Sequence, residues 1–264
     1  MIWPYILLGV LFLAGLGFVL WRSYKRVSEA EARQKSKLKK QMTSNIAHEL
    51  RTPVTSIRGY LETLIACPDM NPEKKQEFIE KAYNQTLRLS ELITDMALIS
   101  KMEEKSAKFQ KEDIDIFDVS NEVFEEFGER LVANRVKVEN LLEPGTVLTG
   151  NKTLVYTILK NLVENSLKYA GTDITIHLEC YSFIEKYCYL TYYDTGSGVP
   201  QEHLDQIFER FYRIEEGRTR EVGGSGLGLS IVKNAVKFHG GDIRAINRQW
   251  GGLQFFFSLR RQEN

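Results

Sequence analysis

The stretch Asn45-Ile46-Ala47-His48-Glu49-Leu50-Arg51-Thr52-Pro53 decides the fold of the first half of the chain. Its apolar residues, continued by Ile57 and Leu61, recur at helical spacing, and His48 falls off this stripe toward solvent. Pro53 cannot donate a hydrogen bond to the carbonyl of Glu49, so we expect the helix to bend directly after His48. An exposed imidazole beside a carboxylate suits nucleophilic phosphoryl transfer. Glu49 can hold the proton on one ring nitrogen, which leaves the other nitrogen free to attack.

The helical pattern extends to both sides and predicts a helical hairpin over residues 41–104. Pro68–Pro72 has the composition of a loop, with Asn71 as the N-cap of a second helix that continues past Ile99. The apolar stripe is too large for one hairpin to bury, so we expect two copies to form a dimeric four-helix bundle. The alternative is a coiled-coil spacer without chemistry.

Residues 2–21 carry no charged side chain. A helix of this length spans about 30 Å, the thickness of the hydrocarbon core of a bilayer. A secretory signal peptide would begin with positive charge and end in a small-residue cleavage site, and a core helix is rarely apolar on every face. We therefore expect a transmembrane helix at 2–21 and a juxtamembrane helical linker at 22–40. The eight Lys and Arg of this linker predict that the bulk of the chain is cytoplasmic.

After Lys111 the pattern changes and predicts an α+β two-layer sandwich over residues 112–262, in which helices cover one face of a mixed sheet. We expect helices at 119–134, 151–169 and 226–239, and strands at 114–117, 136–142, 147–150, 174–181, 187–194, 243–247 and 253–259. The chain is therefore predicted to be a multidomain protein.

Composition excludes several classes of protein. The 35 Lys and Arg balance the 35 Asp and Glu, which gives no support to a nucleic-acid partner. The sequence contains no P-loop and no protein-kinase catalytic-loop motif. Cys67, Cys180 and Cys188 lack the spacing of a zinc site or a disulfide framework. Cys180 and Cys188 could face each other across a hairpin, although buried reduced thiols are the simpler interpretation.

The run that ends in His48-Glu49-Leu50-Arg51-Thr52-Pro53 resembles the phosphoacceptor box of bacterial sensor histidine kinases. Four further runs resemble the boxes of that family in the same order. They are Asn161–Tyr169 (asparagine box), Asp194–Pro200 (first glycine box), Phe208–Arg213 (phenylalanine box) and Gly223–Leu229 (second glycine box). Any one of these motifs would be weak alone, but five in register are highly specific.

The resemblance implies a site for Mg-ATP. Asn161 and Asn165 project from one helical face, and by resemblance Asn165 is the Mg²⁺ ligand, an amide oxygen being a suitable hard donor. Lys168 would neutralise phosphate charge, and Tyr169 would pack near the base. In the family, the carboxylate that matches Asp194 accepts the adenine amino group.

Glycines at several positions complete the expected nucleotide site. Gly196 and Gly198 would permit close backbone approach. Gly224, Gly226, Leu227 and Gly228 would bind phosphate at the start of a helix, through free N–H groups. Arg213, and with less support Arg210, could reach the γ-phosphate. The polar stretch between Arg213 and Gly223 suits a mobile lid.

The resemblance further implies a protein-histidine kinase that phosphorylates His48 and passes the phosphoryl group to an aspartate of a response-regulator receiver domain. Such a kinase would be a homodimer in the inner membrane. Glu49 and Thr52 match a pattern linked to dephosphorylation of the regulator, with Glu49 as proton acceptor and Thr52 positioning water.

Two other interpretations of the function remain possible from the sequence. One is an ATPase like those of gyrase, a class of heat-shock chaperones and MutL, which share the sandwich and would not need His48. The other is a membrane-anchored scaffold without catalysis. The sequence leaves open the stimulus, the identity of the regulator, whether phosphorylation runs within or between protomers, and whether a sensor domain lies upstream.

Overall fold

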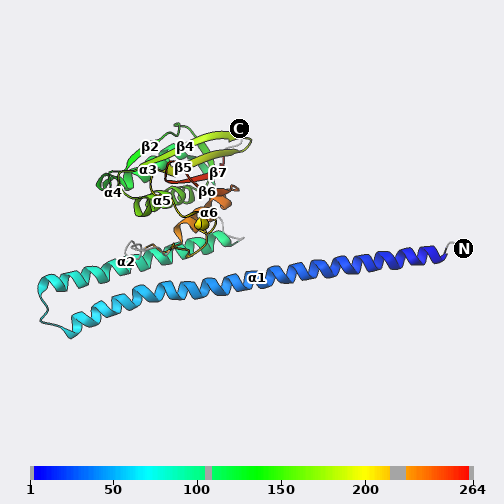
Figure 1. Cartoon of the computed structure of the whole chain (residues 1–264), viewed down its shortest axis with the longest axis horizontal. Coiled ribbons are helices and arrows are strands. Elements are labelled where there is room, and N and C mark those ends of the chain that lie inside the picture. The colour runs from blue at the N-terminus through cyan, green and yellow to red at the C-terminus, as the bar shows by residue number, and fades with distance from the viewer. Residues whose placement is uncertain (1–2, 105–108, 215–223, 262–264) are drawn as a thin grey trace.

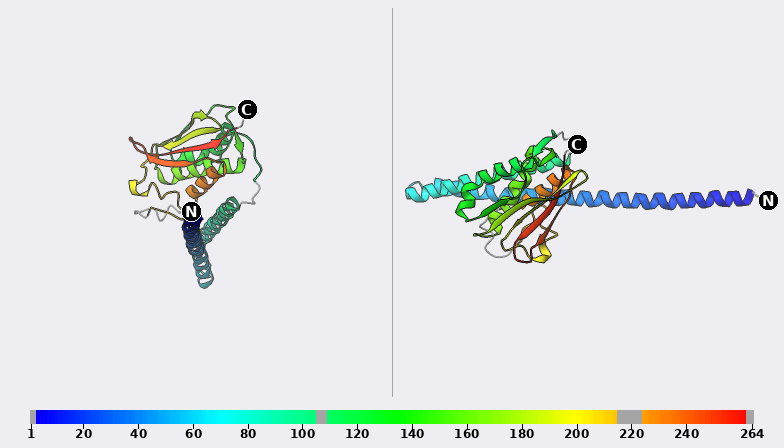
Figure 2. Two further views of the ribbon diagram at one scale, coloured as in Figure 1. Left: turned by 90° about the vertical axis from the view of Figure 1, so that its right-hand side faces the viewer. Right: turned by 90° about the horizontal axis from the view of Figure 1, so that it is seen from above.

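The computed structural model describes residues 3–104, 109–214 and 224–261. Two long helices, α1 (Trp3–Ala66) and α2 (Pro72–Glu103), form an antiparallel hairpin, and a compact α+β unit lies against α2 (Figure 1). The N-terminal part of α1 extends well beyond the hairpin (Figures 1 and 2). The helical hairpin and the two-part organisation expected from the sequence are therefore present.

Local signals in the sequence define the hairpin turn. The side chain of Asn71 accepts a hydrogen bond from the backbone N–H of Glu73 at 2.9 Å, and Pro72 is the first residue of α2. The aromatic rings of Tyr60 and Phe78 pack across the two helices with centroids 5.7 Å apart. Helix α1 continues without interruption through Pro53, which is buried.

The predicted membrane span falls on the first part of α1, where few side chains are described. Of residues 3–21, these are Gly17, Leu20 and Trp21. Within the described part of the chain, no helix combines the length and the apolar character needed to cross a membrane.

The α+β unit contains a five-stranded mixed sheet with the strand order β2-β4-β5-β7-β6. The strands are β2 (Lys137–Asn140), β4 (Thr175–Ile184), β5 (Tyr187–Asp194), β6 (Ile243–Asn247) and β7 (Leu253–Arg260). Only the β2–β4 pair is parallel. Three helices cover one face of this sheet, α3 (Ile116–Glu126), α5 (Lys152–Tyr169) and α6 (Gly228–Phe238) (Figure 1). The predicted two-layer sandwich is confirmed.

The start of the unit differs from the expected element bounds. A separate two-stranded sheet pairs β1 (Glu112–Asp115) with β3 (Val147–Gly150). The strand expected to reach Phe117 ends at Asp115, because this side chain accepts a hydrogen bond from the Phe117 N–H and caps α3. The expected helix at 119–134 is divided at Phe127 into α3 and the short α4 (Gly128–Ala133).

The unit docks on the C-terminal half of α2. Ile99 of α2 is fully buried against Leu227 and Ile231, and Phe211 packs beside them. Arg210 forms an ion pair with Glu103 at the edge of this contact. The face of the unit that carries the N-terminus of α6 is thereby held next to α2.

Candidate functional site

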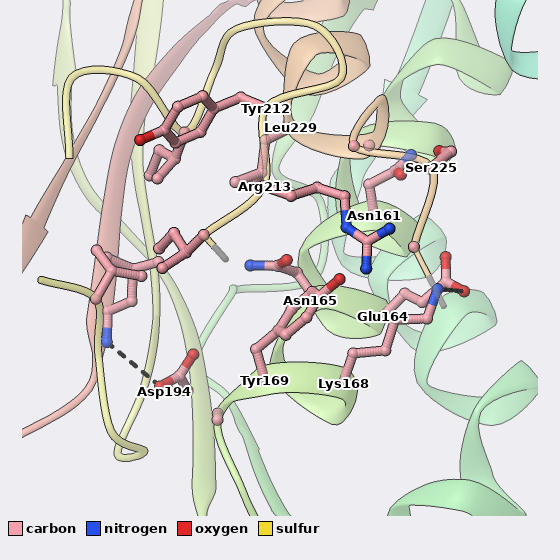
Figure 3. Close-up of a pocket in the computed structure, with 18 of the residues that line it drawn as sticks. Asn161, Glu164, Asn165, Lys168, Tyr169, Asp194, Tyr212, Arg213, Ser225 and Leu229 are labelled. Atoms are coloured by element: carbon pink, nitrogen blue, oxygen red, sulfur yellow. Dashed lines mark hydrogen bonds and ion pairs between the residues drawn. The ribbon is translucent and has the colours of Figure 1, made fainter. Parts of the chain in front are cut away.

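A cavity of about 390 Å³ lies between α2, α5, the end of β5 and the N-terminus of α6. Side chains from segments far apart in the sequence converge on it (Figure 3). Of the residues predicted to bind the nucleotide, ten line it: Asn161, Asn165, Lys168, Tyr169, Asp194, Gly198, Arg213, Gly224, Gly226 and Gly228. Gly196 and Leu227 are adjacent to lining residues but do not line it. Residues predicted from separate motifs thus come together at one continuous cavity, which is also lined by residues that were not predicted.

Helix α5 supplies the two amides. The side-chain N–H of Asn161 donates to the Thr157 carbonyl at 2.8 Å, which fixes the orientation of the amide. Within the described residues, no hydrogen bond holds the Asn165 amide. Lys168 pairs with Glu164, one helical turn earlier, at 2.8 Å. One face of a single helix therefore presents amide oxygens, a carboxylate and an ammonium group to the cavity.

Asp194 lies at the end of β5 and is only 3% exposed. Its carboxylate accepts hydrogen bonds from the Ser166 hydroxyl at 2.8 Å, from the Gly196 N–H at 3.0 Å and from the Leu253 N–H at 3.3 Å. Burial of a charged group is tolerated when it is hydrogen-bonded in this way. Asp194 is therefore held in one orientation at the inner end of the cavity.

The support of Asp194 was not assigned from the sequence. The hydroxyl of Tyr192 donates to Ser166 at 3.0 Å, and Ser166 in turn donates to Asp194. Burial raises the pKa of Tyr192 above its ordinary value, so this phenol stays protonated. Ser166 stands inside the asparagine-box run, but its spacing from the amides gave no sign of a partner on another strand.

Glycines are required where the backbone passes close to other groups. A Cβ on Gly196 would lie 2.3 Å from the carbonyl oxygen of Ala170, and one on Gly228 would lie 2.6 Å from the amide oxygen of Asn161. Gly226 has φ +69° and a backbone neighbour, Phe211, at 2.8 Å from its missing Cβ. The absence of a Cβ at Gly228 allows α6 to begin directly beside Asn161 of α5, and Gly196 and Gly226 allow equally close approaches to Ala170 and Phe211.

The N-terminus of α6 opens onto the cavity. Gly228 is its first residue, and both Gly226 and Gly228 line the cavity. The side chain of Leu227 points away, because it is buried against α2 and is only 1% exposed. Free N–H groups and the helix dipole at such an end favour an anion.

The two arginines proposed to reach the γ-phosphate, Arg210 and Arg213, lie in different surroundings. Figure 3 shows the Arg213 side chain extending into the cavity toward the amides of α5. Arg210 does not line the cavity and pairs with Glu103 of α2. The stretch expected to form a lid falls largely on residues 215–223, outside the described residues.

Helix α2 also contributes to the cavity, through Arg88, Glu91, Leu92 and Asp95. Burial, together with the negative charges of Glu164 and Glu91, raises the pKa of Asp95 to about 6. These residues were not predicted. Their helical spacing places them on one face, but nothing in the sequence indicated that the α+β unit would cover that face.

His48 lies on α1, outside the cavity lining. Its imidazole is exposed, and its Nδ1 is 3.9 Å from a carboxylate oxygen of Glu49. The Thr52 hydroxyl donates to the His48 carbonyl at 3.3 Å. Helix α1 ends at Ala66 and α2 begins at Pro72, on either side of the turn. His48 and Ser90 are the same number of residues away from these two helix ends, so they lie at about the same level of the hairpin. The cavity residues Arg88–Asp95 span this level, so His48 and the cavity lie at a similar height along the hairpin axis.

The residues of the cavity fit Mg²⁺ bound together with a nucleotide. Within the described residues, no group of three His, Cys, Asp or Glu side chains could hold a metal alone. Mg²⁺ that keeps its waters and phosphate ligands needs only one or two protein oxygens. The amide oxygen of Asn165 meets that need.

Comparisons with known proteins identify both parts. The model of the His Kinase A (phospho-acceptor) domain matches residues 38–105, and that of the "Histidine kinase-, DNA gyrase B-, and HSP90-like ATPase" matches residues 150–263. The sensor histidine kinase WalK of Bacillus subtilis (strain 168) is 31% identical over 227 residues, or 85% of this chain. The chain belongs to the sensor histidine kinase family.

Other members of this family extend the comparison. The sensor histidine kinase RppB of Synechocystis sp. is 31% identical over 258 residues, which cover 96% of this chain. This chain spans 37% of the length of WalK and 56% of that of RppB. The crystal structure of the histidine kinase ThkA in complex with the response regulator TrrA shares the fold, with TM-score 0.69, 22% identity, and coverage of 90% of this chain and 66% of that one.

Proposed function

We propose that this chain uses Mg-ATP to phosphorylate His48 and then transfers the phosphoryl group to an aspartate of a response regulator. The observation that carries the proposal is the convergence of the α5 amides, buried Asp194, Arg213 and the N-terminus of α6 on one cavity beside the level of an exposed His48. The ATPase family model and the response regulator bound to ThkA support it.

The residues have distinct roles in this reaction. Asp194 accepts the adenine amino group, while Arg213, Lys168 and the α6 N-terminus neutralise the phosphates. Asn165 would hold Mg²⁺, which would supply further charge neutralisation when bound. His48 attacks the γ-phosphorus through one ring nitrogen, and the bond to the bridging oxygen breaks to release ADP. Glu49, at 3.9 Å from Nδ1, stabilises the proton on the other nitrogen.

The wider assembly belongs to the same proposal. Residues 2–21 span the membrane, 22–40 link this span to the hairpin at 41–104, and 112–262 form the ATP-binding domain. Two chains associate through their hairpins. Glu49 and Thr52 additionally serve dephosphorylation of the regulator; full phosphatase activity in Thr52→Ala would remove Thr52 from that role.

Incubation of the whole chain with γ-labelled ATP tests the kinase proposal. We expect acid-labile, alkali-stable label on the protein, and its transfer to a receiver domain found by screening. His48→Gln should abolish the label while nucleotide binding persists, because His48 lies outside the cavity.

The same experiment separates the rivals. An ATPase of the gyrase type would release labelled phosphate equally in wild type and His48→Gln, with no label on the protein. A scaffold without catalysis would neither release labelled phosphate nor carry label on the protein. Exposed Thr55 offers a matched control, because Thr55→Ser changes α1 two turns after His48 and should leave the label unchanged.

A further inference from the structure

Cys180 and Cys188 are two free cysteines that lie next to each other outside the nucleotide cavity. They lie on β4 and β5, with their Sγ atoms 2.8 Å apart. They are not directly opposite, since Cys180 pairs with Leu190 and Cys188 pairs with Phe183. A register shift between Cys180 and Ser182 adds Tyr181 to β4 as an extra residue. This bulge is the local irregularity at which the two thiols meet.

The two thiols differ in access to solvent. Cys188 is fully buried, whereas Cys180 is partly exposed. Of the two residues, Cys180 is therefore the one with part of its surface in contact with solvent. The third cysteine, Cys67, lies exposed in the turn of the helical hairpin and provides an internal comparison.

The surroundings also distinguish the thiols electronically. The hydrogen bond shared with Cys188 lowers the pKa of Cys180, burial partly opposes this shift, and the positive charge of Arg261 adds to it. The bond to Cys180, followed by burial, raises the pKa of Cys188. The Arg261 side chain is held over the ring of Phe183, with 5.1 Å to its centroid. The lowered pKa favours the thiolate at Cys180, which is also the more exposed of the two residues, and thiolate is the reactive form.

We propose that Cys180 and Cys188 are a peroxide-reactive site that closes to an intramolecular disulfide. The Cys180 thiolate attacks one oxygen of a small peroxide, the O–O bond breaks, and the departing oxygen takes a proton to leave as water or an alcohol. Cys180 becomes a sulfenic acid. The sulfur of Cys188 then attacks the Cys180 sulfur and displaces hydroxide, which leaves as water with the proton of Cys188. Two thiols are oxidised and one peroxide is reduced.

Little movement is needed for closure. The present separation of 2.8 Å exceeds the bond length of a disulfide, roughly 2.0 Å, by less than the radius of an atom. The β4–β5 hairpin already holds the two sulfur atoms next to each other. The attack of Cys188 on the sulfenic acid should therefore be faster than further oxidation of Cys180. The site does not depend on the kinase proposal, because neither cysteine lines the nucleotide cavity.

Hydrogen peroxide applied to the full chain tests the proposal, followed by alkylation and peptide mass mapping. We expect loss of two alkylatable thiols, a Cys180–Cys188 crosslinked peptide about 2 Da lighter than its reduced form, and reversal by dithiothreitol. Cys67 should still react with the alkylating reagent after the peroxide treatment. A crosslink that involves Cys67, or persistence of free Cys180 and Cys188 after Cys67 has oxidised, would overturn the proposal.

Variants identify the order of the steps. In Cys188→Ala, which keeps an apolar group at this buried position, Cys180 should stop at a sulfenic acid that dimedone traps. In Cys180→Ser, Cys188 should remain a thiol. Cys67→Ser is the matched control and should form the disulfide as wild type does. Oxidation of Cys188 in the absence of the Cys180 thiol would contradict the assigned order.

Discussion

Asp194 is a buried carboxylate whose orientation depends on two hydroxyls: Ser166 of α5 donates to it, and Tyr192 of β5 donates to Ser166. The Asp-x-Gly-x-Gly spacing identified the carboxylate and the need for nearby glycines. It did not identify Ser166 and Tyr192, which hold the carboxylate in place. Those contacts join positions 26 to 28 residues apart, and no local pattern specifies which hydroxyl on a helix meets which side chain on a strand.

Replacement of Asp194 by Asn should weaken ATP binding about ten- to a hundredfold, because a charged hydrogen bond of this kind contributes roughly 1.5–3 kcal/mol. Isothermal titration with a non-hydrolysable ATP analogue measures the change. Asp194 is buried and hydrogen-bonded, so thermal unfolding must show that the variant is folded. Ser166→Ala is a matched control: it removes one support but keeps the charge, and should reduce affinity less. Equal affinities of wild type and Asp194→Asn would remove Asp194 from the adenine site.

At the scale of elements, each helix and strand was largely predictable, but the contact between α2 and the α+β unit was not. Helical periodicity indicates that Ile99 faces something apolar; only the fold shows that its partners are Leu227 and Ile231. The same contact brings Asp95 of α2 against α5 and into the nucleotide cavity. A carboxylate on a helix surface thereby becomes a half-buried group.

The pKa of Asp95 gives a pH dependence. Burial first, then Glu164 and Glu91, raise this pKa from 3.8 to about 6, partly offset by Lys168 and Lys160. The folded state therefore binds the Asp95 proton more tightly than the unfolded state. The resulting stabilisation is fully present below about pH 4 and is lost as the pH rises through about 6.

Asp95→Asn should therefore melt at a higher temperature than wild type near neutral pH, because it removes a half-buried charge, and this difference should shrink as the pH falls through about 6. Thermal unfolding of both proteins across this range measures it. Glu91→Gln, on the same face of α2, keeps Asp95 but removes one repelling charge, so its effect should be smaller. A difference between Asp95→Asn and wild type that stays constant with pH would show that Asp95 does not titrate in this range.

For the whole molecule, the described hairpin leaves a second apolar surface uncovered. Val54, Leu61 and Ile65 of α1 are exposed at helical spacing, and so are Ile79, Tyr83, Leu87 and Ile93 of α2. The α+β unit covers a different part of α2, centred on Ile99. An exposed apolar surface of this kind indicates an interface, and a second hairpin is the partner that the predicted four-helix bundle requires.

If two chains associate through this surface, Leu61→Glu should separate them, because dimerisation would bury an unpaired carboxylate from each chain. Light scattering of the full chain in detergent, corrected for the bound detergent, should change from the mass of two chains to that of one. Thr55→Glu introduces the same charge at an exposed polar position of α1 and should leave the mass at two chains. The unfolding temperature of the α+β unit should be the same in both variants, because neither position contacts its core. A Leu61→Glu protein that is folded and still has the mass of two chains would place the dimer contact elsewhere than on this face.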